Sequence, residues 1–172
     1  MRRILVGLTL LSAISIWAAD KIQPLNVKAG LWESTTTVTT SGEMPIPAGM
    51  LARLSPDQRA KLEARMKANS AGHSKTTTHK SCETTEKLKE SPFSNEKQCS
   101  ETVLTSTSNR TEVKVTCDYG EVKGSGTIKI EALSSESVKG SGEITATGGG
   151  RTMNSSTSFS SKWLGASCGN VE

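Results

Sequence analysis

Several segments of the chain alternate apolar and polar residues with a period of two. Val113, Val115 and Cys117 alternate with charged and hydroxyl residues, and residues 128–132 and 159–163 alternate in the same way. Turn-forming residues separate these segments at short intervals. Because successive side chains of a strand point to opposite faces of its sheet, the pattern predicts half-buried β-strands. We therefore expect a mainly β domain, an antiparallel meander that forms a barrel-like or strongly curled sheet.

One short motif occurs twice in the predicted strands. Val-Lys-Gly-Ser-Gly stands at residues 122–126 and again at 138–142, and an isoleucine follows two residues after each copy. A period of sixteen residues fits two strands and two turns. We therefore expect the copies on alternate strands that run in the same direction, with glycine kinks where the sheet curls. A phosphate-binding glycine loop is not favoured, because no basic helix start follows either copy.

The beginning of the chain has the order of a secretory signal peptide. Arg2 and Arg3 precede an apolar run over residues 4–17, and small residues follow it. The run is shorter than the ~20 residues that a membrane-spanning helix needs. We expect residues 1–19 to be a cleaved signal peptide; an uncleaved anchor is the alternative. Residues 20–172 would then be a single β-rich domain, periplasmic or secreted, with no transmembrane segment.

The chain has four cysteines, and all of them lie after the predicted signal peptide. In an exported protein an even number of cysteines predicts disulfides. A metal site or redox pair is not favoured, because no C-x-x-C is present and the spacings match no zinc pattern. A hairpin centred on Ser108 places Cys99 opposite Cys117, at a distance that a disulfide accepts. Cys82 then pairs with Cys168 by elimination. With only 34% hydrophobic residues, the small core needs both bonds.

One amphipathic helix is predicted over residues 55–70. Ser55 can cap it, Pro56 suits its first turn, and Gln58 completes a capping box. Its many basic residues could dock on anionic lipid or polysaccharide. An ordinary solvated face, on a helix that lies over the sheet, is the favoured interpretation. The apolar stripe is formed by Leu51, Leu54, Leu62 and Met66, and the possible partner surface by Arg59, Arg65 and Lys67.

The sequence contains no recognisable arrangement of catalytic residues. It has no G-x-S-x-G motif and no paired carboxylates. His73 and His79 are the only histidines. A copper or zinc site that joins them to Met44 or Met50 is conceivable, but solvated side chains are favoured. We therefore expect no enzymatic activity and no cofactor.

Charge and aromatic content argue against nucleic acid as a partner. The formal net charge of +4 falls to +2 when Arg2 and Arg3 leave with the signal peptide, and aromatic residues make up 3% of the chain. Such a chain offers no extended stacking surface for bases. Two of the aromatic residues, Trp32 and Trp163, lie near opposite ends of the domain. If the first and last strands meet, we expect these two structural tryptophans to cluster and close the sheet.

A set of short motifs resembles a known family. Residues 30–33 (Gly-Leu-Trp-Glu), residues 55–63, the Lys-Ser-Cys before residue 83, residues 149–154 and residues 162–165 together resemble the exported bacterial proteins of domain of unknown function 3617. The resemblance extends over about residues 29–169. It implies a bacterial, periplasmic protein that carries a signal peptide. It implies no catalytic residues, because none are established for the family.

Taken together, these observations predict an exported, non-enzymatic protein. The few large side chains would leave space inside a barrel-like sheet, so we expect a small apolar or amphipathic ligand in that interior. The alternative is an envelope-associated structural or interaction module that uses the basic helix 55–69. The partner would then be an envelope component.

Overall fold

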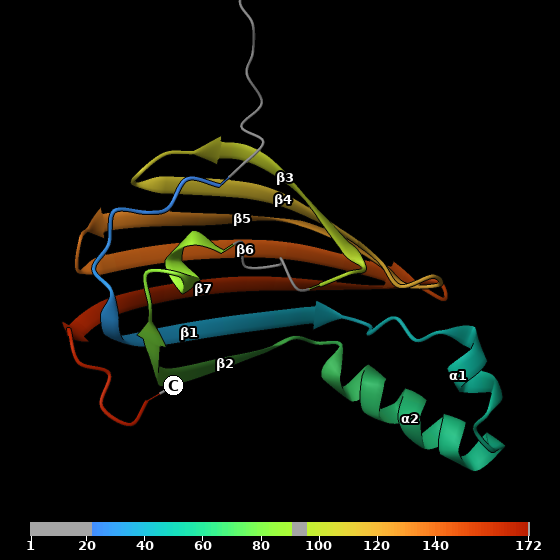
Figure 1. The fold of residues 1–172 in the computed structure, drawn as a ribbon. Helices are drawn as coiled ribbons and strands as arrows, with labels where there is room; N and C mark the ends of the chain where they lie inside the picture. The colour runs from blue at the N-terminus through green and yellow to red at the C-terminus, as the bar shows by residue number, and fades with distance from the viewer. Residues whose placement is uncertain (1–21, 91–95, 172) are drawn as a thin grey trace, which may run out of the picture.

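The computed structural model describes residues 22–90 and 96–171 of the chain. The predicted signal peptide, residues 1–19, lies outside the described residues. The described part forms one antiparallel sheet with two α-helices and one 3-10 helix, η1 (Figure 1). In chain order the elements are β1 (Gly30–Gly42), α1 (Ala48–Ala52), α2 (Pro56–Asn69), β2 (His73–Glu83), η1 (Lys87–Lys89), β3 (Cys99–Ser106), β4 (Arg110–Asp118), β5 (Lys123–Ser134), β6 (Ser137–Gly148) and β7 (Arg151–Gly165).

The prediction of a mainly β, antiparallel fold is confirmed. The seven strands lie in the order β2-β1-β7-β6-β5-β4-β3, and every neighbouring pair is antiparallel. The first and last strands, β1 and β7, are neighbours inside the sheet. The sheet is curved but not closed, because β2 lies outside β1 and β3 lies at the opposite edge (Figure 1). The expected barrel interior is therefore wrong, and the open curled sheet replaces it.

Tight turns join the four strands from β4 to β7 in chain order. Only two residues separate β5 from β6, and two glycines separate β6 from β7. Gly149 and Gly150 have φ values of 58° and 74°, and positive φ at both positions is what a type I′ hairpin turn requires. Glycine adopts this conformation without the steric cost that a Cβ would add.

The repeated glycine motif lies on neighbouring strands, so the expected placement on alternate parallel strands is wrong. The two copies lie on β5 and β6, which are antiparallel and twelve residues long. The sixteen residues from the start of one copy to the start of the next therefore run along β5, through its two-residue turn and into β6. In this register Gly126 faces Ile144 and Gly142 faces Ile128. Each isoleucine thus lies opposite a residue without a side chain, which relieves crowding on that face of the sheet.

The two faces of the sheet differ in composition, and this difference locates the core. One face, here called the apolar face, carries most of the apolar strand residues together with some serines and threonines. The opposite face carries hydroxyl and charged side chains, including a threonine ladder between β1 and β2. Buried apolar side chains among the described residues are Trp32, Ile46, Val113 and Val115. Thr111 on the same face is also buried, and most other residues of that face are half-buried or exposed.

Helix α2 has the predicted start, since Ser55 and Gln58 form a complete capping box. It does not lie over the sheet as expected. Helices α1 and α2 project beyond the ends of β1 and β2 (Figure 1). Leu62 and Met66 are only half-buried, so the stripe gives the helix too little apolar surface to hold it on the sheet. None of the helices in the described residues is long and apolar enough to cross a membrane.

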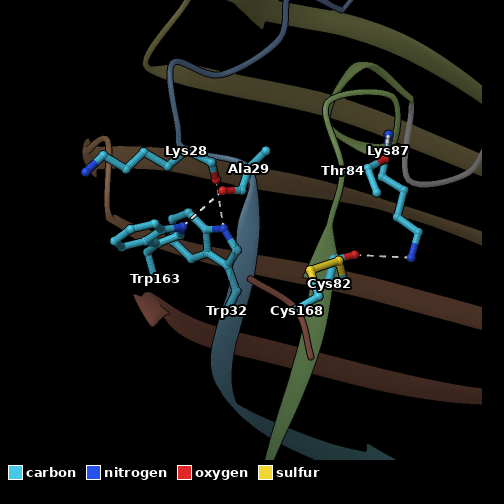
Figure 2. The surroundings of a disulfide bond; sticks show 8 residues. All are labelled: Lys28, Ala29, Trp32, Cys82, Thr84, Lys87, Trp163 and Cys168. Carbon is cyan, nitrogen blue, oxygen red and sulfur yellow. Dashed lines mark hydrogen bonds between the residues drawn. A yellow bond between two sulfur atoms is a disulfide. The ribbon is translucent and has the colours of Figure 1, made fainter. Parts of the chain in front are cut away.

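Both predicted disulfides are present, and each holds one edge of the open sheet. Cys99 of edge strand β3 is bonded to Cys117, its register partner on β4. Cys82 of edge strand β2 is bonded to Cys168 in the segment after β7 (Figure 2). Edge strands are paired on one side only and separate most easily. The two bonds therefore fix the strands that a closed barrel would have paired.

Candidate functional site

The N-terminal segment before β1 covers part of the apolar face. Residues 22–29, here called the covering segment, pass across one end of the sheet (Figure 1). The amide N–H of Asn26 donates to Ser108 O in the β3–β4 turn, and that of Lys28 donates to Ser135 O in the β5–β6 turn. The distances are 2.6 and 2.8 Å. These bonds attach the segment to both turns.

Two tryptophans attach the covering segment to the sheet at its other end. Trp32 on β1 and Trp163 on β7 are register partners. The Trp32 Nε1–H donates to Lys28 O at 2.9 Å, and the Trp163 Nε1–H donates to Ala29 O at 3.1 Å (Figure 2). Lys28 Nζ also lies 4.5 Å from the Trp163 ring centroid. The tryptophans thus lie together, and they hold the covering segment in place without closing the sheet.

A cavity of about 250 Å³ lies between the covering segment and the apolar face. Ile22, Leu25 and Val27 line it from the covering segment, and Leu88 lines it from η1. Residues of six strands line most of the remainder, with Trp32, Ile130, Val138 and Phe159 as the large apolar contributors. Glu83, Lys87 and Glu90 add charged groups to the lining. The cavity thus has a predominantly apolar wall built from residues far apart in the sequence.

Four hydroxyl residues lie among the apolar residues of this cavity: Ser34, Ser81, Thr111 and Ser161. Ser34 Oγ and Ser161 Oγ, on adjacent strands, are 2.6 Å apart and hydrogen-bonded to each other. Thr111 is 5% exposed, and its Oγ1 has no hydrogen-bond partner. A buried hydroxyl without a partner costs free energy, on the order of 1–3 kcal/mol. Among the described residues, Thr111 thus brings a buried hydroxyl without a partner to the cavity wall.

A second cavity, of about 410 Å³, lies at the other end of the same face. Val115, Ile144 and the Cys99–Cys117 disulfide line it. Gly124 and Gly126 also line it, and the absence of side chains there deepens it. Ile144 is 37% exposed, so part of this surface is open to solvent.

The charged side chains of the strands lie mainly on the opposite face, where they form ion pairs. A hydrogen bond from Lys129, with a further one from Arg110, lowers the pKa of Glu112 below its usual value. A hydrogen bond from Lys162 likewise lowers the pKa of Glu33. These carboxylates are ionised partners in surface pairs. They are placed to support the sheet and do not face the cavity.

The structure does not bring the candidate metal ligands together. His73 and His79 are exposed at different positions along edge strand β2, and Met44 and Met50 are exposed in and after the loop that follows β1. Within residues 22–90 and 96–171 there is no group of three His, Cys, Asp or Glu side chains that could hold a metal ion. The histidines have the solvated positions that the sequence favoured.

The possible partner surface on α2 is exposed, and its three residues differ in their contacts. Arg59, Arg65 and Lys67 all have exposed side chains. Arg59 Nη2 donates to Leu51 O at 2.8 Å and so connects α2 to α1. Arg59 therefore has a structural contact. In the part of the chain that the structure describes, the side chains of Arg65 and Lys67 are exposed without a comparable contact to α1.

Sequence reasoning identified Trp32 and the strands at 128–132 and 159–163, but it missed Thr111 and the covering segment as parts of the cavity. Thr111 precedes Val113 by two positions, so the strand period places it on the apolar face, and this signal could have identified it. No comparable signal existed for the covering segment, because its position depends on turns that are more than eighty residues away in the sequence.

The fold and this site together define a class of protein: an open, seven-stranded antiparallel β-domain with two edge disulfides and a partly covered apolar face. Residues 27–168 match the family described as Protein of unknown function (DUF3617), and the chain belongs to this family. No curated protein and no solved structure matches the chain. The resemblance inferred from the sequence motifs is therefore confirmed.

Proposed function

We propose that this protein is exported and binds a small apolar or amphipathic ligand in the cavity under the covering segment. The observation that carries the proposal is the wall of that cavity, where apolar side chains of the covering segment, η1 and the sheet surround about 250 Å³. A cavity of about 150 Å³ with apolar walls is enough to hold benzene. The proposed role is binding without catalysis.

The disulfides and the N-terminal sequence support export. Disulfides persist in oxidising compartments such as the periplasm. Both bonds join parts of the chain that the fold holds close, at Cα–Cα distances of 5.5 and 4.0 Å. The order of residues in 1–19 is that of a secretory signal. Fractionation of expressing cells tests this part, and retention of the full-length chain in the cytoplasm would contradict it.

Ligand binding is tested with two variants that fill different cavities. Val138→Phe adds bulk to the cavity under the covering segment, and Gly124→Leu adds bulk to the second cavity, where a Cβ meets nothing nearer than 3.9 Å. Binding of a neutral naphthylamine probe should weaken at least tenfold in Val138→Phe and stay unchanged in Gly124→Leu. Equal binding by both variants and the wild type would refute the site.

Native mass spectrometry provides an independent test. Protein isolated from the periplasm should carry a small organic molecule that is lost from Val138→Phe but retained by Gly124→Leu. Absence of any such molecule, together with failure to bind the probe, would end the proposal.

The exposure of helix α2 favours a second function, docking on an anionic envelope component. The helix projects from the sheet with Arg65 and Lys67 exposed (Figure 1). The double change Arg65→Glu and Lys67→Glu should then abolish association with envelope fractions. Arg59→Glu is a less suitable variant, because Arg59 also bonds to Leu51 O. Unchanged fractionation of the double variant would exclude this function.

A further inference from the structure

The cavity under the covering segment offers hydrogen-bond donors, and its charged lining residues, two glutamates and one lysine, have a net negative charge. We propose that it takes a neutral amphiphile, a molecule with one uncharged acceptor group, such as an ester, ketone or amide, on a short apolar chain. The inference rests on the proposed function, because it names the ligand class of the same cavity.

Thr111 supplies the first donor. It lines the cavity, it is 5% exposed, and its Oγ1 has no partner in the structure. Rotation about χ1 moves the hydroxyl to another staggered position, and the hydroxyl hydrogen itself rotates about the C–O bond, so the O–H can turn toward a ligand beside this wall. A ligand acceptor there would supply the hydrogen bond that the buried hydroxyl lacks.

The serine pair supplies the second donor. In the pair formed by Ser34 and Ser161, one hydroxyl donates to the other across 2.6 Å. The accepting hydroxyl keeps its own hydrogen, because a hydroxyl donates one bond and accepts others. Both serines line the cavity, so this hydrogen can serve a ligand acceptor.

The charges at the cavity favour an uncharged ligand over an anionic one. Glu83, Glu90 and Lys87 line it. The Lys87 ammonium donates to Cys82 O at 3.2 Å (Figure 2), which engages the cation with the backbone beside the disulfide. A carboxylate ligand would meet two carboxylates and one ammonium, a lining of net negative charge that repels an anion. An uncharged acceptor avoids this repulsion and can accept from Thr111, which lies three strands away from Ser161 in the sheet.

The size of the cavity limits the chain. If about 150 Å³ holds benzene, a volume of about 250 Å³ holds on the order of ten non-hydrogen atoms. This corresponds to an ester, ketone or amide with a medium-length chain. Ile130, Val138 and Phe159 supply the apolar wall for that chain.

Three probes of similar size test the ligand class: methyl octanoate, octanoate and nonane. Binding to the purified, oxidised protein is followed by tryptophan fluorescence, because Trp32 lines the cavity. Methyl octanoate should bind at least tenfold more tightly than either octanoate or nonane at neutral pH. Equal binding of methyl octanoate and nonane would show that the donors are not used, and tighter binding of octanoate would overturn the uncharged class.

Two substitutions at Thr111 test the donor itself. Thr111→Val keeps the shape of the side chain and removes the hydroxyl, so it should weaken methyl octanoate binding about tenfold and leave nonane binding unchanged. Thr111→Ser keeps the donor and should bind methyl octanoate within about threefold of the wild type. Equal methyl octanoate binding by the wild type and Thr111→Val overturns the inference while the proposed function stands. If none of the three probes binds, the proposed function itself fails.

Discussion

Removal of the two disulfides should destabilise this protein unequally, and the expected difference follows from the separation of the bonded cysteines. Cys82 and Cys168 are 86 residues apart, whereas Cys99 and Cys117 are 18 apart. A cross-link restricts the unfolded chain more when it closes a longer loop. The chain-entropy relation gives about 4.6 kcal/mol for the longer loop and about 3.2 kcal/mol for the shorter one at 25 °C.

The folded structure also predicts that loss of the Cys82–Cys168 bond destabilises the protein more than loss of the Cys99–Cys117 bond. Cys99 and Cys117 lie on strands that are already paired along their length, so the hairpin keeps them close after the bond is removed. Cys82 and Cys168 are joined across no such hairpin, since Cys168 lies beyond the end of β7. A domain with a stability of about 5–15 kcal/mol loses a large part of it with the Cys82–Cys168 bond.

The assay is urea unfolding of two double variants, Cys82→Ala with Cys168→Ala and Cys99→Ala with Cys117→Ala. Tryptophan fluorescence reports on Trp32 and Trp163, which lie together at the attachment of the covering segment. The Cys82/Cys168 variant should lose more free energy of unfolding, by about 1 kcal/mol or more. An equal or larger loss in the Cys99/Cys117 variant would refute the loop-length reasoning.

Two further predictions concern packing and pH. Gly140→Ala should destabilise the fold by about 1–3 kcal/mol in urea unfolding, because its Cβ would lie 2.2 Å from Phe159 Cε1. Gly124→Ala is the matched control, and an equal loss in that variant would contradict the steric reason. Glu112 has a pKa lowered in the fold, so its contribution is present above the unfolded value of about 4.3 and is lost as pH falls through the folded value. As pH falls below ~4.3, the urea midpoint should therefore fall less steeply in Glu112→Gln than in the wild type. Parallel curves of urea midpoint against pH for the two proteins would disprove the stabilising role of Glu112.

Much of the local structure could be predicted from short-range patterns. The alternation at Val113, Val115 and Cys117 identified a strand and its buried face, and the turn around Ser108 set the register of Cys99 with Cys117. Ser55 identified the start of α2. Each of these predictions depends on residues that are close in sequence, where strand period, hairpin register and capping chemistry act directly.

Predictions that depended on distant contacts were less successful. The spacing of the glycine repeat fitted either two short strands or one long strand between the copies. The two-residue turn after Ser134 shows that one long strand is correct. Helix α2 was expected over the sheet, although Leu62 and Met66 offer too little apolar surface to hold it there. The cavity was expected inside a barrel, and it lies instead under the covering segment.

The sequence by itself determined the strands, the faces on which their side chains lie, the start of the long helix and the pairing of the cysteines. These properties follow from the period of two along a strand, the residues of turns and caps, and the even number of cysteines. The tertiary structure alone decided that the sheet stays open. Because β1 pairs with β7 on one side and β2 on the other, β2 and β3 are left as edges, each held by a disulfide. It also placed Thr111 without a partner beside residues 22–29, since contacts between distant segments form only when the whole chain has folded.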